Sequence, residues 1–369
     1  MNAIIDKIEG RTIARAFNDT VSANTEASAL RWKSGDQWQE WTFAEYADRV
    51  ARAAGGLRKL GVKRGDRIVL MIRNRAEFHV LDIAALMLGA TPISIYNSSA
   101  PDQIEYLVGH CGAVLGVVED DGFLARFESV RHALPNLRSL GVIDAGERPA
   151  DFTWDDLLAA DPLDLEVEAA AGDSADLATV IYTSGTTGPP KGVMITNRNV
   201  LFVSESIRAV LPFEDPTGKR VVSYLPMAHI AERTVSHYGQ AILGYGVWCC
   251  PVPGSVAAFC TEAKPHILFG VPRVWEKIHA GVSAAIAADP EKAAQFDEAV
   301  DAARPIALRR AWGTATEEDD ATYAFLDEVA FKPIRQLLGL DDVLMAVTGA
   351  APIPASLLGW YQAIGVPLS

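Results

Sequence analysis

The chain is poor in cysteine. It has four cysteines among 369 residues, Cys111, Cys249, Cys250 and Cys260, and none of them forms a Cys-x-x-Cys pair. Disulfide-stapled secreted domains and most thiolate zinc sites need more cysteines at closer spacing. We therefore expect buried free thiols, a cytoplasmic location and no metal site built from these residues.

Positive charge is also in deficit. The chain has 33 basic against 47 acidic residues, a formal net charge of −14. This balance disfavours an extended nucleic-acid surface and favours solubility. Any site for an anionic ligand must then be lined locally by Lys, Arg and backbone N–H groups.

Long uninterrupted apolar runs are missing as well. The N-terminal residues 1–17 contain no apolar core of signal-peptide length. The longest stretch without a charged residue, 234–261, is broken by Gly239, Gly244, Gly246, Pro251, Pro253 and Gly254. It cannot form one spanning helix, so we expect a buried strand and helix near a pocket. Peripheral membrane contact stays open as an alternative, and the sequence does not indicate an oligomeric state.

What is present is an alternation of short apolar runs and helical patterns, which predicts an α/β fold with a mainly parallel sheet. The predicted strands are 67–72, 91–96, 113–118, 178–182, 221–225, 266–269 and 343–347. Helices are expected over 76–88 and 101–110, after a capping box of Thr42 and Glu45, and from Pro272. The proline-containing, acidic segment 146–173 predicts a surface connection. It would separate a first α/β unit, 40–150, from a second, 174–369.

The most informative stretch is IYTSGTTGPPKGV, residues 181–193. A strand ends near Tyr182 and gives way to glycines and hydroxyl residues, which let backbone N–H groups approach phosphate oxygens closely. A lysine near the end of the loop adds a point charge. The candidate phosphate ligands are Thr183, Ser184, Gly185, Thr186, Thr187, Gly188 and Lys191.

Other interpretations of this loop fit less well. A Walker A loop has Gly before its Lys and Ser or Thr after it, whereas Pro190 and Gly192 flank Lys191. The stretch is not a GxGxxG motif either. An ordinary polar turn is the plain alternative, but a turn does not need this many hydroxyls followed by a lysine.

The string resembles the phosphate-binding signature of the adenylate-forming (AMP-binding) enzymes. In that superfamily the loop holds the β- and γ-phosphates of ATP while a substrate carboxylate attacks the α-phosphorus. The resemblance implies a large N-terminal domain of two packed, mainly parallel sheets flanked by helices.

Three further motifs resemble the long-chain fatty acyl-CoA ligase subgroup. In SYLPMAHIAER, 223–233, the resemblance places His229 at the acyl site, although a lone histidine is more often structural. Arg233 stands where some bacterial relatives carry a gating Trp. The motif GVPRVWEKI, 270–278, starts a helix and indicates the subgroup through Trp275.

The third motif, VTGAAPIP at 347–354, is otherwise a plain strand-to-helix turn. By resemblance it passes over the adenine and ribose and supplies the nucleotide-binding residues Gly349, Ala350, Ala351 and Pro352. The segment 96–113, YNSSAPDQIEYLVGHCGA, also resembles the subgroup.

Several family elements have no counterpart among these residues. The Tyr-Gly-x-Thr-Glu segment with its magnesium-binding Glu, the ribose-binding Thr-Gly-Asp and the small domain with the catalytic lysine are not found in 1–369. We therefore assign no catalytic residue and no metal ligand. The expectation is a C-terminally truncated AMP-binding domain that lacks the C-terminal small domain.

The function implied by the resemblance is ATP-dependent activation of a long-chain fatty acid to acyl-AMP and its transfer to CoA. ATP, Mg²⁺ and CoA would be co-substrates, with no prosthetic group. One alternative is a non-catalytic fragment that at most binds nucleotide. Another is adenylation of an aromatic or amino acid, which the His229 and Trp275 motifs disfavour.

Overall fold

The computed structural model describes residues 2–183 and 188–369. The chain divides into two compact units. Unit 1 is Met1–Leu211, Asp215–Gly218 and Ser223–Pro253; unit 2 is Pro212–Glu214, Lys219–Val222 and Gly254–Ser369. The sub-units 40–150 and 174–369 stay a prediction, and both ranges contribute strands to unit 1.

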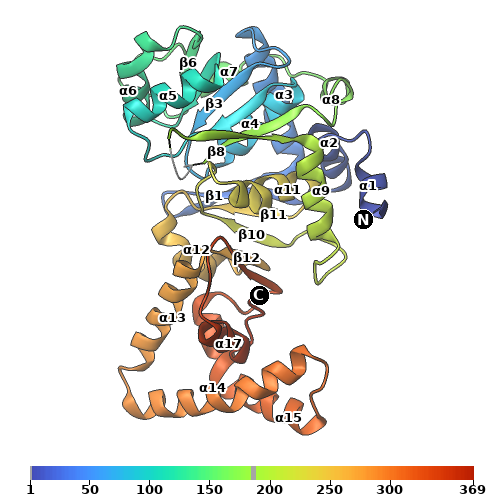
Figure 1. Ribbon diagram of the computed structural model, residues 1–369, viewed down its shortest axis with the longest axis vertical. Coiled ribbons are helices and arrows are strands. Elements are labelled where there is room, and N and C mark those ends of the chain that lie inside the picture. Colours follow the sequence, from blue (N-terminus) through green and yellow to red (C-terminus); the bar gives the residue numbers. More distant parts are fainter. Residues whose placement is uncertain (1, 184–187) are drawn as a thin grey trace. The chain divides into compact units, whose positions relative to one another are not determined.

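Unit 1 contains a five-stranded parallel sheet in the order β4-β3-β5-β6-β7. Its strands are β3 (Arg67–Met71), β4 (Thr91–Ser94), β5 (Leu115–Val118), β6 (Ser139–Val142) and β7 (Phe152–Thr153), in blue to green in Figure 1. Each is short and most are rich in Val, Ile and Leu, as strands covered on both faces usually are. The three strands predicted between 67 and 118 are confirmed.

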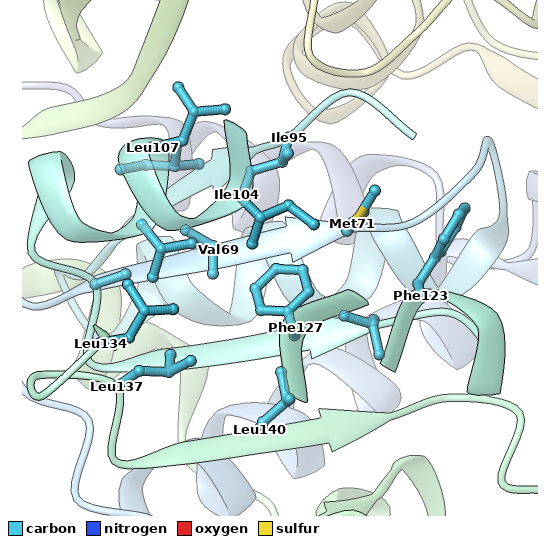
Figure 2. Close-up of a cluster of buried hydrophobic side chains, with 14 of the residues drawn as sticks. Val69, Met71, Ile95, Ile104, Leu107, Phe123, Phe127, Leu134, Leu137 and Leu140 are labelled. Atoms are coloured by element: carbon cyan, nitrogen blue, oxygen red, sulfur yellow. The ribbon is translucent and has the colours of Figure 1, made fainter. Parts of the chain in front are cut away.

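One face of this sheet is covered by α5 (Pro101–Cys111) and α6 (Asp121–Val130), with the turn η1 (Arg131–Ala133) after them. Figure 2 shows Ile104 and Leu107 of α5 and Phe127 of α6 gathered over the strand that carries Val69. All four side chains are buried. Their burial fixes α5 on the sheet, since each large apolar side chain contributes roughly 1.5–3 kcal/mol.

Helix α4 (Ala76–Met87) contacts β4 of this sheet and β1 (Ser28–Ser34) of a second one, and helix α3 (Phe43–Lys59) contacts α4 and the second sheet. In the second sheet β1 pairs antiparallel with β2 (Gln37–Thr42) and parallel with β11 (Gly246–Cys249). Nearly every side chain of α4 is buried, as expected of a mostly apolar helix that lies between layers. The predicted fold class, two packed sheets flanked by helices, is confirmed, as is the Thr42–Glu45 capping box.

The segment 146–173 differs from the surface connection that its composition predicted. It contains β7, α7 (Trp154–Leu158) and α8 (Leu165–Ala170). Its acidic residues cap these helices: Asp156 completes a capping box with Thr153, and Asp164 accepts the N–H groups of Glu166 and Val167. The composition did not reveal these helices, because acidic residues are common both as helix caps and in solvent-exposed loops.

The remaining elements of unit 1 lie at the two ends of its sequence. They are α1 (Asn2–Ile8), α2 (Ile13–Ala23), β8 (Leu177–Thr183), β9 (Lys191–Thr196), α9 (Asn197–Arg208), α10 (Ile230–Glu232), the π-helical turn η2 (Arg233–Tyr238) and α11 (Gly239–Leu243). The charge-free stretch 234–261 thus holds the buried helix and strand that were predicted, α11 and β11. Among the described residues, no helix combines the length and apolarity needed to cross a bilayer.

Unit 2 is built on the parallel strands β12 (Ile267–Gly270) and β13 (Met345–Thr348), with β10 (Arg220–Ser223) pairing beside β12. Pro272 starts a helix as predicted, and Tyr361 donates to the backbone of Trp275 at 2.7 Å. Its other elements are η3 (Pro253–Ser255), α12 (Val256–Ala263), α13 (Pro272–Ile286), α14 (Pro290–Ala311), α15 (Glu317–Leu326), η4 (Asp327–Phe331), α16 (Lys332–Leu338) and α17 (Ala355–Ala363).

A fully buried ionic cluster joins α4 to η2 inside unit 1. Arg233 forms a salt bridge with Asp82, and neither side chain has any exposed surface. The guanidinium also donates to Ser94 Oγ at 2.7 Å and to the Tyr238 hydroxyl. Buried charges are stable only when paired and hydrogen-bonded in this way.

Two histidines extend the cluster. His237 Nε2 lies 2.8 Å from Asp82, and its Nδ1 lies 3.0 Å from His79 Nδ1. Burial lowers the pKa of both imidazoles, so both are neutral. His237 then donates through Nε2 to the carboxylate and accepts from His79 Nδ1–H.

We predict that Asp82→Ala costs about 3–5 kcal/mol of stability, because it leaves the Arg233 guanidinium buried without its counter-ion. The double variant Asp82→Leu/Arg233→Met removes both charges and should lose less stability than the sum of the losses of the single variants Asp82→Leu and Arg233→Met. Urea unfolding followed by circular dichroism measures each value. Additive losses would show that the two side chains do not stabilise each other.

Candidate functional site

The predicted phosphate loop lies in an antiparallel hairpin. Strand β8 pairs with β9 so that Tyr182 faces Gly192 and Thr183 faces Lys191. Ser184, Gly185, Thr186 and Thr187 lie outside the described residues. The pairing places the Thr183 and Lys191 backbones opposite each other at the mouth of the turn, with the exposed Lys191 opening β9.

Two glycines of this hairpin have identifiable structural reasons. Gly188 adopts φ +85°, a backbone conformation that favours glycine. A Cβ on Gly192 would come within 2.8 Å of Val180 Cγ1 and 3.4 Å of Tyr182 Cζ. The glycine after Lys191 therefore lets side chains of β8 lie across β9.

A cavity of about 660 Å³ in unit 1 is bounded by the hairpin, by α5 and by the turn before α10. This size falls within the roughly 300–1,000 Å³ typical of small-molecule sites. Its lining residues are Tyr96, Ser98, Ser99, Asp102, Gln103, Tyr106, Leu107, Ile181, Tyr182, Thr183, Pro190, His229 and Ile230. The structure thus brings the phosphate-loop candidate Thr183 and the acyl-site candidate His229 to one cavity.

Sequence reasoning missed the aromatic part of this lining. Tyr96, Tyr106 and Tyr182 all contribute to the wall. Tyr96 and Tyr106 belong to the segment 96–113, which carries a family resemblance but had no assigned role. A helical spacing that places Tyr106 one turn before His110 on α5 was the available signal.

His229 caps the helix that follows it. Its Nδ1 accepts the backbone N–H of Ala231 at 3.1 Å, and its backbone N–H donates to the Pro226 carbonyl at 2.9 Å. With Nδ1 accepting, a neutral imidazole carries its proton on Nε2. The ring is held in one orientation at the cavity wall.

Glu232 is buried and stabilises the turn that carries His229 through hydrogen bonds to its carboxyl group. Its carboxyl accepts hydrogen bonds from the Ser223 hydroxyl at 2.7 Å, the Ser236 hydroxyl at 2.6 Å and the Leu225 N–H at 3.2 Å. Burial raises the pKa of Glu232 to about 7, against the lowering effect of these hydrogen bonds. The Glu-Arg pair after His229 therefore has an internal, positioning role, and Arg233 does not line the cavity.

The predicted nucleotide-binding residues belong to unit 2. Gly349, Ala350, Ala351 and Pro352 follow β13, as expected of a strand-to-helix turn. Ala350 has φ +69°, a conformation that costs a non-glycine residue about 1–2 kcal/mol. Strained backbone of this kind is often found at ligand sites. A Cβ on Gly349 would pack at 3.4 Å from the Phe269 ring.

The described part of the chain offers no preformed metal site. Within it, no group of three or more His, Cys, Asp or Glu side chains is placed to hold an ion. The four cysteines are free and buried, as their scarcity and apolar neighbours predicted.

These elements define an α/β protein with a glycine- and hydroxyl-rich hairpin beside a cavity, and comparison with known sequences identifies its family. The family model described as AMP-binding enzyme matches residues 17–368. The chain therefore belongs to the AMP-binding, adenylate-forming enzymes.

Curated relatives are long-chain fatty-acid CoA ligases. The chain is 30% identical over 97% of its length to long-chain-fatty-acid–CoA ligase ACSBG2 of Xenopus laevis, covering 50% of that protein. It is 31% identical over 90% of its length to FadD15 of Mycobacterium bovis, covering 55% of that ligase. The predicted subgroup is confirmed, and the chain spans about half the length of the curated relatives it matches.

Solved structures agree on the fold. The N-terminal domain of FACL13 from Mycobacterium tuberculosis superposes with a TM-score of 0.66 at 20% identity, covering 97% of this chain and 74% of that one. The anthranilate CoA ligase AuaEII, solved in complex with anthranoyl-AMP, gives a TM-score of 0.72 at 19% identity, with 97% and 59% covered.

We predict a pH-dependent stability difference between the wild type and Glu232→Gln. The folded pKa of about 7 lies above the ordinary value of 4.5, so the favourable contribution of the protonated carboxyl is complete below pH 4.5. It is lost as pH rises towards 7. Relative to the Glu232→Gln variant, whose amide cannot ionise, the wild type should lose about 3 kcal/mol over this interval, at 1.36 kcal/mol per pKa unit.

Urea unfolding at pH 4.5, 6 and 7.5 measures this difference. Glu105→Gln, at an exposed position of α5, is the matched control and should show no such trend. A stability difference between wild type and Glu232→Gln that is constant with pH would mean that folding does not raise the pKa of Glu232.

Proposed function

We propose that this chain binds ATP and a long-chain fatty acid. The reaction in which it takes part is the activation of the acid to acyl-AMP and its transfer to CoA. Membership of the AMP-binding family and the ligase names of its relatives support the reaction class. The observation that carries the proposal is the single cavity shared by Thr183, Pro190 and His229.

The chemistry requires a phosphate chain and a carboxylate to meet. Lys191 brings a positive charge to the hairpin of a chain whose net charge is −14, and an exposed ammonium can contact the β- and γ-phosphates. Charge that builds on phosphate oxygens during carboxylate attack is stabilised by positioned donors of this kind. Gly349, Ala350, Ala351 and Pro352 would contact the nucleoside, and His229 would orient the acyl chain.

CoA and Mg²⁺ enter as co-substrates by family membership. Among the described residues no carboxylate cluster is placed for Mg²⁺, so we derive no step through the ion. The long-chain identity of the acid, a cytoplasmic location and peripheral membrane contact belong to the same proposal and rest on the relatives.

A second candidate is a chain that binds nucleotide without turning it over. The observation that favours it is coverage, since the chain spans 50% of the Xenopus laevis ligase and 55% of the Mycobacterium bovis ligase. The family resemblance implies that catalysis requires groups from both halves of a ligase sequence. Binding and turnover therefore have to be measured separately.

For binding, we predict that Lys191→Ala weakens ATP affinity about ten- to hundredfold, because a hydrogen bond to a charged group contributes roughly 1.5–3 kcal/mol. Isothermal titration with Mg·ATP measures it. Lys59→Ala, at an exposed position of α3, removes the same charge elsewhere and should leave affinity unchanged. Equal ATP affinity of Lys191→Ala and wild type would show that the hairpin does not contribute to the ATP site.

For turnover, the purified chain is incubated with ATP, Mg²⁺, palmitate and CoA, and AMP and acyl-CoA are quantified. Product that disappears in Lys191→Ala supports the ligase. ATP binding without product at any protein concentration supports the non-catalytic alternative. Replacing palmitate by benzoate tests the aromatic-acid alternative, which we expect to give no product.

A further inference from the structure

Helix α5 contacts both sides of the β8–β9 hairpin at one of its ends. The Tyr106 hydroxyl donates to the carbonyl oxygen of Pro190 at 2.9 Å, immediately before β9. One turn later, His110 Nδ1 lies 2.8 Å from the Tyr182 hydroxyl, one residue before the end of β8. Two neighbouring side chains of one helix thus hold the two strands where they approach the turn.

The two contacting rings also support each other. Tyr106 and His110 are stacked, with centroids 5.4 Å apart and an interplanar angle of 27°. The His110 ring meets Tyr182 edge to face, with centroids 5.7 Å apart. Such aromatic pairs are worth about 0.5–1.5 kcal/mol beyond their buried area. The three rings form a continuous contact from α5 to β8.

The hairpin needs outside support. β8 and β9 form a separate two-stranded sheet, and an isolated hairpin is at best marginally stable in water. Its body is fixed by the Thr179 hydroxyl, which donates to the Pro92 carbonyl of β4 at 2.8 Å. The end nearer the turn is supported by Tyr106 and His110.

Helix α5 provides a firm anchor. Ile104, Leu107 and Val108 are buried against the five-stranded sheet, while Tyr106 and His110 lie on the side facing the hairpin. A displacement of the hairpin therefore has to break these contacts or move a packed helix. Thr183 and Lys191 directly follow Tyr182 and Pro190 and pair with each other across the hairpin. Fixing Tyr182 and Pro190 therefore also fixes the backbone positions of Thr183 and Lys191.

We propose that Tyr106 and His110 are positioning residues for phosphate binding, which set where Thr183 and Lys191 meet the β- and γ-phosphates of ATP. The inference rests on the proposed function of the hairpin. It gives the segment 96–113 a role through contacts with β8 and β9, and neither residue needs to touch the nucleotide.

The test uses variants that keep the rings. Tyr106→Phe removes one hydroxyl, and His110→Phe removes one ring nitrogen contact while retaining an aromatic side chain. Each loses about one neutral hydrogen bond, worth roughly 0.5–1.5 kcal/mol, or about two- to tenfold. Glu105→Gln, on the same helix at an exposed position, is the matched control.

The first readout is hydrogen exchange of the amides of β8 and β9, followed by mass spectrometry on the full chain. Both ring variants should exchange these amides about two to ten times faster than wild type and Glu105→Gln. Amides of β3 and β5 should exchange at wild-type rates, since the opening is local. Unchanged exchange in the hairpin of both variants would overturn the proposal.

The second readout compares ATP with AMP, which lacks the β- and γ-phosphates. Both variants should bind ATP about two to ten times more weakly and AMP equally well. Equal weakening for both nucleotides would indicate a general structural defect and overturn the positioning role. A wild-type chain that binds neither nucleotide would refute the proposed function, and hydrogen exchange would still decide whether α5 restrains the hairpin.

Discussion

The salt bridge between Arg233 and Asp82 is the constraint on which the cavity wall depends. Removing one partner of a fully buried pair costs about 3–5 kcal/mol, so α4 and η2 have one favourable arrangement. Glu232, the residue before this arginine, closes the turn back to Ser223 and Leu225. His229 lies on that turn, so its position follows from contacts in the interior.

The opposite wall is fixed by different means. The hairpin is held to β4 through Thr179 and to α5 through Tyr106 and His110. Neutral hydrogen bonds and stacked rings contribute less per contact than a buried ion pair. One wall of the cavity is therefore rigid, while the wall that would contact phosphates is restrained by contacts that can be broken singly.

The sequence predicted most of the parallel strands, because buried strands of Val, Ile and Leu leave a clear apolar signal, but it missed β6 and β7. It did not predict β9, since the exposed side chains of Val193 and Met194 give Lys191–Thr196 neither burial nor a clean alternation. The sequence did not predict β7, α7 and α8 within the segment 146–173, where Asp156 and Asp164 serve as helix caps. In the site, single residues such as His229 could be proposed from motifs, but long-range contacts such as Tyr106 to Pro190 follow from tertiary structure alone.

Arg233 also limits how the cavity beside His229 can change shape. An aromatic side chain that gates a channel exchanges one apolar contact for another when it swings, at little electrostatic cost. The Arg233 guanidinium has Asp82, Ser94 and Tyr238 as partners and no exposed surface. Any rotation of the Arg233 side chain away from this position would leave the Asp82 carboxylate buried without its counter-ion. Residue 233 therefore acts as part of the core, and the cavity wall is formed by other residues, Ile230 and Tyr96 among them.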